Sequence, residues 1–446
     1  MPKMKPHQLS ASAAVLFAVT TILHGAAAMQ PPSVVVFRNV TTIPMDSNRI
    51  AHAQTVVVRG SSIDVVGSTA SVRMPAGAVV VDGTGRFLVP GLTDMHVHLP
   101  GPAARPSRAE NELFSYVANG VTAVRSMAGS IHHLRLRERI DAGELMGPTL
   151  VLAGPGLDGE RVKSPEDGER EVREQKARGF DLVKILPGLS LASYDAIVKT
   201  ARDANITFAG HVPADVGIRH AIESRQSTIE HLDGYLELLK GREPITVETM
   251  APIVAETTRS GVWNVPTMAV MAVNVGMEDT KALVRRPELQ YIASEYVDQW
   301  LELRRRSNIP KPVSEIIQVN RMRVLKALND AGAGILLGTD SPQLFNAPGF
   351  SIVREMQMLA DAGMSPYQVI RAGTEQIGRY LNRPCGTVTS GACADLILLD
   401  GNPLDDLRNF TKRLGVMIRG RWIPEADIQR RLERIRNAPG NYRPAE

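Results

Sequence analysis

Two histidines separated by one residue are the first candidates for chemistry in this chain of 446 residues. His96 and His98 lie in Leu92–Leu99, a segment that we interpret as a strand. Side chains two positions apart on a strand lie on the same face, so the two imidazoles would point together. Because neutral histidine is the commonest metal ligand in proteins, this pair predicts a metal site.

Four further polar residues stand within or at the end of later strand candidates: Lys184, His211, His231 and Asp340. Lys184 is the least expected of them, because it interrupts an apolar run. Each residue alone has a structural explanation, such as a hydrogen-bonded core histidine or a lysine that reaches the surface. Catalytic residues of barrels come from the ends of several strands at one face, so the joint placement favours a single site.

Such a site needs a scaffold that brings many strand ends to one face. After residue 90, short apolar runs alternate with helical patterns, which is typical of βα repeats and a parallel sheet. Eight such units predict an α/β fold with a (β/α)8 TIM barrel, and the long helical stretch before the last strand would cover the barrel mouth. The strand candidates are Leu92–Leu99, Thr122–Ser126, Thr149–Ala153, Leu182–Leu186, Thr207–His211, Ser227–His231, Trp263–Met268 and Ile335–Asp340.

Short β-type runs occur on both sides of this region. They cover 33–40, 55–59, 62–67, 78–82 and 86–89 before it, and 386–388, 394–399 and 414–419 after it. We therefore expect one β-sandwich domain from residues 29–89 and 383–446, with the barrel, residues 90–382, inserted between them. Cys385 and Cys393 flank a predicted hairpin in the second part, where a disulfide and two buried thiols are equally compatible with the sequence.

Residues 1–28 have the pattern of a secretory signal peptide. Lys3 and Lys5 precede the apolar run 11–23, and small residues follow at 26–28. We expect export to the periplasm or the extracellular space. Removal of this segment lowers the net charge from +4 to about +2. Aromatic residues make up 4% of the chain and do not alternate with basic ones, so nothing indicates nucleic-acid binding, and no later segment has the length of a membrane span.

The motifs together resemble the amidohydrolase superfamily, and most closely its imidazolonepropionase-like and prolidase-like metal-dependent hydrolases. The resemblance lies in PGLTDMHVH at 90–98, Lys184, His211, His231 and GTDS at 338–341. It continues through ACADL at 392–396 and GNPL at 401–404, and covers essentially the whole mature chain. Ser126 and Val353 depart from residues that relatives often carry, which bears on the substrate rather than on the metal ligands.

This resemblance implies a site for two divalent metal ions, with zinc preferred and manganese or cobalt also suitable. His96, His98 and Asp340 would hold one ion, and His211 and His231 the other. Lys184 would bridge them as an N-carboxylated lysine. A hydroxide between the ions would attack an amide C–N bond, and Asp340 would carry the proton to the leaving group.

The implied substrate is a small amide or peptide, such as an Xaa-Pro dipeptide or an N-acyl amino acid. Tyr235, Arg161 and Lys163 are candidates for binding its carboxylate, although each could also be an ordinary loop residue. The alternatives are hydrolysis of a cyclic amide or lactone, a non-catalytic metal-binding relative, and a one-metal deaminase, which would lack Lys184. We also expect a homo-oligomer, although the sequence does not report its size.

Overall fold

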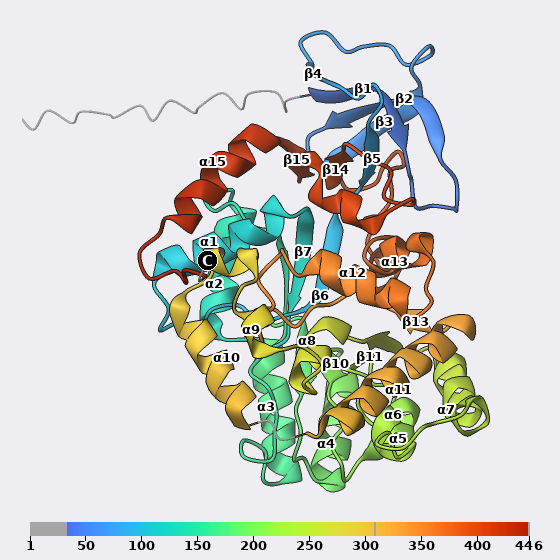
Figure 1. The fold of residues 1–446 in the computed structure, drawn as a ribbon, viewed down its shortest axis with the longest axis vertical. Helices are drawn as coiled ribbons and strands as arrows, with labels where there is room; N and C mark the ends of the chain where they lie inside the picture. Colours follow the sequence, from blue (N-terminus) through green and yellow to red (C-terminus); the bar gives the residue numbers. More distant parts are fainter. Residues whose placement is uncertain (1–33, 307–308, 445–446) are drawn as a thin grey trace, which may run out of the picture.

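The computed structural model describes residues 34–306 and 309–444, so the predicted signal peptide lies outside the described residues. A ring of parallel strands with surrounding helices forms the larger part, and a sheet lies at one end of it (Figure 1). Among the described residues, no helix is both long enough and apolar enough to cross a membrane. The predicted α/β fold is confirmed.

All eight predicted barrel strands are present as parallel strands, in two sheets that meet at both edges. The ring strands are β6 (Leu92–Val97), β7 (Val121–Ser126), β8 (Thr149–Leu152), β9 (Leu182–Ile185), β10 (Thr207–Gly210), β11 (Thr228–Glu230), β12 (Trp263–Val265) and β13 (Gly334–Ile335). A parallel bridge between Ala153 and Leu182 joins β8 to β9, and another between Val97 and Ser341 joins the last segment to β6. Because both faces of such strands are covered, their sequences are short apolar runs.

The last strand is longer than its assigned two residues suggest. The backbone N–H of Met95 donates to the carbonyl of Leu337, and the N–H of Asp340 donates to the carbonyl of His96 at 2.7 Å. The segment after β13 therefore continues beside β6 and carries Asp340 to the same end of the ring as His96.

Helices follow the strands and cover the outside of the ring (Figure 1). Gly120 and Gly261, with φ of 77° and 74°, follow α1 and α7 in the left-handed conformation that favours glycine at helix ends. The helices are α1 (Pro106–Ala118), α2 (Ile131–Asp141), α3 (Pro165–Ala177), α4 (Leu191–Asp203), α5 (Gly217–Glu223), α6 (Tyr235–Leu238), α7 (Val247–Ser260), α8 (Met268–Asn274), α9 (Thr280–Leu283), η1 (Pro287–Tyr291), α10 (Ser294–Arg306), α11 (Lys311–Asp330), α12 (Ile352–Asp361), α13 (Pro366–Ala372) and α14 (Glu375–Leu381).

Both chain ends contribute to one eight-stranded sheet, with the order β16-β15-β14-β5-β1-β2-β3 and with β4 beside β1. Buried residues from both ends, including Phe37 and Leu398, share one hydrophobic core. The predicted β unit is therefore present as one sheet, and the strand predicted at 386–388 is a loop. Its elements are β1 (Val34–Thr42), β2 (Ala51–Arg59), β3 (Ser62–Ser68), β4 (Val79–Asp82), β5 (Phe87–Pro90), β14 (Leu396–Leu399), η2 (Leu407–Thr411), β15 (Arg413–Ile418) and β16 (Arg421–Pro424).

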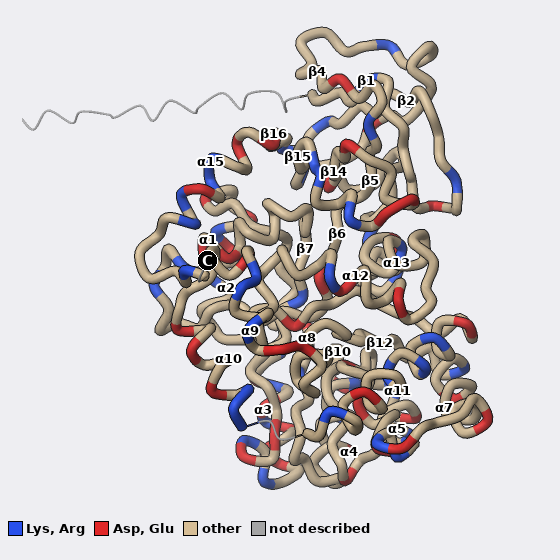
Figure 2. The backbone as a smooth tube through the Cα atoms, in the orientation of Figure 1, with Lys and Arg blue, Asp and Glu red and all other residues tan. Residues whose placement is uncertain are grey.

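The final helix, α15 (Glu425–Arg436), does not pack only on that sheet. Ile428 and Leu432 share a core cluster with Phe114 and Val117 of α1. This helix carries four arginines and three acidic residues, and basic and acidic positions are interspersed along the chain in Figure 2. The domain boundaries predicted at residues 89 and 383 stay a prediction.

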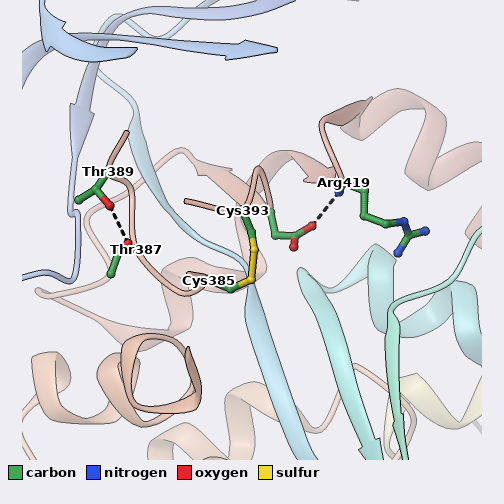
Figure 3. The surroundings of a disulfide bond; sticks show 6 residues. Cys385, Thr387, Thr389, Cys393 and Arg419 are labelled. Carbon is green, nitrogen blue, oxygen red and sulfur yellow. Dashed lines mark hydrogen bonds between the residues drawn. A yellow bond between two sulfur atoms is a disulfide. The ribbon is translucent and has the colours of Figure 1, made fainter. Parts of the chain in front are cut away.

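A disulfide joins Cys385 and Cys393 before β14 (Figure 3). The hydroxyls of Thr387 and Thr389 lie 2.9 Å apart in the loop that it closes, and the N–H of Arg419 donates to Asp395 beyond it. Of the two interpretations left open by the sequence, the structure contains the disulfide.

We expect the Cys385→Ser, Cys393→Ser double variant to unfold at lower urea concentration. Loss of a cross-link between residues eight apart lets the unfolded chain gain entropy, and such losses cost about 2–4 kcal/mol. Urea titration followed by fluorescence, with the reduced wild-type protein as a control, measures the change. Equal stability of oxidised and reduced wild-type protein would show that the cross-link contributes nothing.

Candidate active site

The carboxyl ends of the ring strands surround a cavity of about 510 Å³. The ring centroids of His96 and His231 are 4.7 Å apart, and so are those of His211 and His231. Ligand atoms of His96, His231 and Asp340 all lie within 4.8 Å of one another, so these three side chains meet at one point of the cavity. The structure brings all six predicted ligands to this cavity: His96, His98, Lys184, His211, His231 and Asp340.

Asp340 is the carboxylate of this group. Its Oδ1 lies 2.7 Å from His98 Nε2 and 3.5 Å from His96 Nε2. Burial lowers the pKa of His96 and of His231 well below the ordinary value, so both imidazoles are neutral, which is the form that binds metal. His231 and Asp340 have φ values of 60° and 61°, in the left-handed region that residues other than glycine rarely adopt. Such strained positions are often found at functional sites.

Lys184 is 1% exposed, and its Nζ has no hydrogen-bond partner among the described residues. Burial lowers the pKa of the amine to about 8, although Glu230 and Asp340 oppose the shift. An unpaired buried amine costs free energy, so its position needs a compensating bond. Carboxylation would turn this cation into an oxygen ligand, and the mixed imidazole and carboxylate set would then fit two divalent ions.

Behind the ligands lies a buried chain of charged residues that the sequence analysis did not select. Glu230 Oε2 lies 2.6 Å from His96 Nδ1, and Glu230 Oε1 accepts a bond of 2.7 Å from Arg125. Arg125 also donates to the carbonyl of Met95 at 2.8 Å. Because Nδ1 of His96 is engaged, its Nε2 is left to face Asp340 and the cavity, as metal-binding histidines usually require.

Two of the other three predicted ligand histidines have similar partners. His211 Nδ1 lies 2.6 Å from Asp233 Oδ2, and His231 Nδ1 lies 2.7 Å from the hydroxyl of Thr267. Thr267 precedes α8, which is part of the insertion predicted to cover the mouth. Val270 and Met271 of this helix line the cavity, so the insertion forms one of its walls.

Asp94 lies on β6 near His96 and His98, and it connects this strand to the segment after β13 that carries Asp340. It is fully buried, and it accepts bonds from the backbone N–H and the hydroxyl of Thr339. Burial raises the pKa of Asp94 to about 7, against the effect of these bonds. The contact fixes the backbone on each side of the site, because Thr339 is the neighbour of Asp340.

Glu355 of α12 holds the start of α8. Its two carboxylate oxygens accept bonds from the backbone N–H groups of Met268 and Ala269, at 2.8 and 2.7 Å. Burial raises the pKa of Glu355 to about 8.

We expect Glu355→Ala to lower the free energy of unfolding by about 1–3 kcal/mol, because two buried backbone donors lose their acceptor. The same change should weaken metal binding, since α8 follows Thr267, the partner of His231. Urea unfolding and metal titration measure the two effects. Glu355→Gln, which keeps one acceptor oxygen, should retain part of both, and an unchanged Glu355→Ala protein would contradict this role.

The three residues proposed for substrate binding do not line the cavity. Tyr235 is fully buried, and its hydroxyl contacts Thr257 at 2.9 Å and Asn264 at 3.0 Å in the core. Arg161 is exposed and pairs with Glu171 at 3.0 Å, and Lys163 is exposed on the same loop. The structure therefore brings the predicted ligands together, but not these three.

Glu230 and Arg125 could have been found by the signal that selected Lys184, because each is a charged residue within a strand candidate. Thr267 and Glu355 carried no such signal. Their roles depend on the packing of α8 and α12 against the ring.

A family model for the amidohydrolase family matches residues 87–423 of the chain. Ochratoxinase from Aspergillus niger is 23% identical over 394 residues, which cover 72% of this chain and 72% of that protein. Among solved structures, bottromycin amidohydrolase has a TM-score of 0.73 at 23% identity and covers 91% of both chains. An Xaa-Pro dipeptidase with bound methionine has a TM-score of 0.67 at 19% identity, over 88% of this chain and 100% of its own. At this identity the structural likeness shows the fold.

The matched region begins within β5 and ends within β16, so it includes the whole ring and all six predicted ligands. The sequence match and the convergence of those ligands agree. The chain therefore belongs to the amidohydrolase family, whose members are metal-dependent hydrolases that act on carbon–nitrogen bonds.

Proposed function

We propose that this protein hydrolyses the amide C–N bond of a small substrate with two divalent metal ions, preferably zinc. The observation that carries the proposal is the convergence of four histidines, Asp340 and the unpartnered Lys184 on one cavity. His96, His98 and Asp340 would hold one ion, and His211 and His231 would hold the other. Lys184, once carboxylated, would bind both ions.

Such ions would lower the pKa of water and polarise the scissile carbonyl. The protein supplies the remaining functions. Asp340 faces the cavity and can accept a proton at a carboxylate oxygen, then return it to the leaving nitrogen. Glu230, Asp233 and Thr267 hold His96, His211 and His231 in fixed orientations through their Nδ1 atoms.

For the substrate, we propose peptides or acylated amines, with Xaa-Pro dipeptides and N-acyl amino acids as the first compounds to test. The Xaa-Pro dipeptidase among the structural neighbours supports this choice. Cyclic amides and lactones are the alternative substrates of the same chemistry.

Metal analysis of the purified protein, joined to a hydrolysis screen over peptides, acylated amines and cyclic amides, tests this function. We expect two ions per chain and release of an amine, with activity lost on chelation and restored by zinc or manganese. A protein that holds two ions and cleaves no amide in this range would contradict the proposal.

We also propose that the protein is exported. The signal-peptide pattern of residues 1–28 supports this, and so does the Cys385–Cys393 disulfide, because such bonds persist in oxidising compartments. Cell fractionation with N-terminal sequencing should find the mature chain outside the cytoplasm, starting near residue 29, and an intact cytoplasmic chain would refute export.

A further inference from the structure

We propose that a second cavity, between α6, α8 and α11, is a binding site for a carboxylate group, with the buried guanidinium of Arg321 at its base. Two sources supply this chemistry: the far end of a substrate that reaches out of the cavity of the predicted ligands, and a free carboxylate compound. The site itself does not depend on the proposed amide hydrolysis, because none of the six predicted ligands lines it.

The second cavity adjoins the cavity of the predicted ligands along one helix. Its volume is about 610 Å³, and Met271 and Asn274 of α8 line both cavities. Residues three apart on a helix are neighbours on one face, so these two side chains form a shared wall. A compound whose amide bond lies at the predicted ligands can therefore extend past this wall, and a smaller compound can occupy the second cavity alone.

Arg321 is the residue that points to an anion. It lies on α11, is 3% exposed, and donates to the backbone carbonyl of His231. Its Nε is buried without a hydrogen-bond partner among the described residues. Arginine keeps its charge in proteins, and a buried cation costs free energy unless an anion pairs with it. A carboxylate matches the planar guanidinium, so it is the ligand that this position favours.

The carboxylates whose charges act on Arg321 are bonded to other groups. These residues are Asp233, Glu237 and Glu355. Asp233 contacts His211 at 2.6 Å, and Glu237 accepts a bond of 2.7 Å from the backbone N–H at the start of α6. Both oxygens of Glu355 accept bonds from the start of α8. The guanidinium therefore keeps donor capacity for a ligand in the second cavity.

Two further cations stand at the mouth of the second cavity. Lys240 and Arg242 line it and are exposed, as are the acidic Glu237 and Glu243. Cationic residues thus outnumber acidic ones by three to two in the lining, and Arg321 is the buried one among them. An entering carboxylate would meet weak, screened attraction at the mouth and a stronger charge-assisted bond at the base.

The two proposed metal ions would attract a carboxylate as well. They would lie among the six predicted ligands, on the other side of the wall formed by Met271 and Asn274. A carboxylate bound to the ions and one bound at Arg321 therefore depend on different residues. Substitutions in the second cavity distinguish the two positions.

Calorimetric titration of the metal-loaded protein with glutarate tests the site. Glutaramide is the uncharged analogue of this dicarboxylate, with nearly the same shape. We expect saturable binding of glutarate at millimolar concentration or below. Glutaramide should bind about tenfold or more weakly, because it lacks the charge that Arg321 would pair with.

A charge-reversal variant locates the bound glutarate. Lys240→Glu, Arg242→Glu changes two exposed residues at the mouth and no predicted ligand, and it should weaken glutarate binding by about tenfold or more. Arg73→Glu, Arg259→Glu is the matched control. It makes the same change in net charge at two exposed arginines that line neither cavity, and it should bind glutarate as the wild-type protein does.

Arg321→Lys tests the base of the second cavity. Lysine keeps a cation and a donor for the carbonyl of His231, but it lacks the planar fork that matches a carboxylate. We expect glutarate binding to fall by about fivefold or more, with the metal content unchanged.

Kinetics with leucyl-glutamate and leucyl-glutamine distinguish the two sources of the carboxylate, and this comparison rests on the proposed amide hydrolysis. If the far end of a substrate occupies the site, leucyl-glutamate should have the lower KM, and glutarate should raise that KM. If a free compound occupies it, the two KM values should agree. Glutarate should then change kcat or metal affinity, because Arg321 holds the carbonyl of His231.

The outcomes separate this site from the proposed function. Absence of glutarate binding to the folded wild-type protein overturns the proposal. Equal glutarate binding by the wild-type protein, the charge-reversal variant and Arg321→Lys also overturns it, because the carboxylate would then lie elsewhere, such as on the metal ions. Failure to cleave any amide overturns the proposed function, whereas glutarate binding that these variants weaken still supports the carboxylate site.

Discussion

Lys184→Met should abolish hydrolysis and lower the metal content below two ions per chain. Methionine fills a similar volume but can neither be carboxylated nor supply an oxygen ligand. Loss of ion binding removes several kcal/mol of transition-state stabilisation, so kcat/KM should fall by about a thousandfold or more. Metal analysis and steady-state kinetics measure the two effects.

The stability of the metal-free protein gives an independent test of the same residue. Lys184 Nζ is buried without a partner, so Lys184→Met should make the metal-free chain equally or more stable. With metal present the order should reverse, since ligands that bind only the folded chain stabilise it. A lysine that is merely structural would give the opposite result, a less stable metal-free variant.

Two controls complete the design. Lys176→Ala removes a lysine that is bonded to the carbonyl of Asn205 on the surface, and it should leave metal content unchanged. Lys184→Ala leaves space where the side chain was, so acetate or propionate should restore part of the activity by supplying a carboxylate. If Lys184→Met remained fully active, the two-metal model would be wrong.

Glu230→Gln should weaken metal binding by about 10–100-fold, because His96 loses the carboxylate that fixes its ring. It should also destabilise the fold by about 3–5 kcal/mol, since Arg125 keeps its buried charge without a charged partner. Metal titration against a competing chelator and urea unfolding measure these effects separately.

The double variant Arg125→Met, Glu230→Gln separates positioning from stability. Removal of the arginine should recover part of the lost stability, but metal affinity should stay low because His96 still faces a neutral amide in place of the carboxylate that fixes its ring. Glu112→Gln is a matched control, because Glu112 is another buried carboxylate paired with an arginine, Arg108, and it does not line the cavity. If Glu112→Gln reduced metal affinity as much as Glu230→Gln, the effect would reflect stability and not the orientation of His96.

The sequence was sufficient to predict the strands of the ring and the six polar residues that meet at its cavity. Alternation of apolar runs with helical patterns is a local property, and each ligand stands within or at the end of such a run. Two aligned features, a strand and a polar residue at its end, are enough to place a side chain at the carboxyl face of a parallel barrel. For this reason the local pattern around His96, Lys184 and Asp340 correctly predicted that their side chains meet at one cavity.

The tertiary structure decided the residues around that centre. Tyr235 lies four positions after His231, but α6 turns its side chain into the core, where Thr257 and Asn264 bond its hydroxyl. Glu355 is more than a hundred residues from His231 in sequence, yet it holds the helix that follows Thr267. Such contacts join segments that are distant in the chain, and no local spacing reports them.

The sequence by itself therefore determined which six polar side chains meet at the cavity, since they lie on strands whose ends must meet when the ring closes. Only the tertiary structure decided what surrounds those side chains: the Arg125–Glu230 support of His96 and the cavity wall formed by α8. The physical reason is that backbone pairing fixes strand ends, whereas loop and helix packing fixes the charges that a substrate meets.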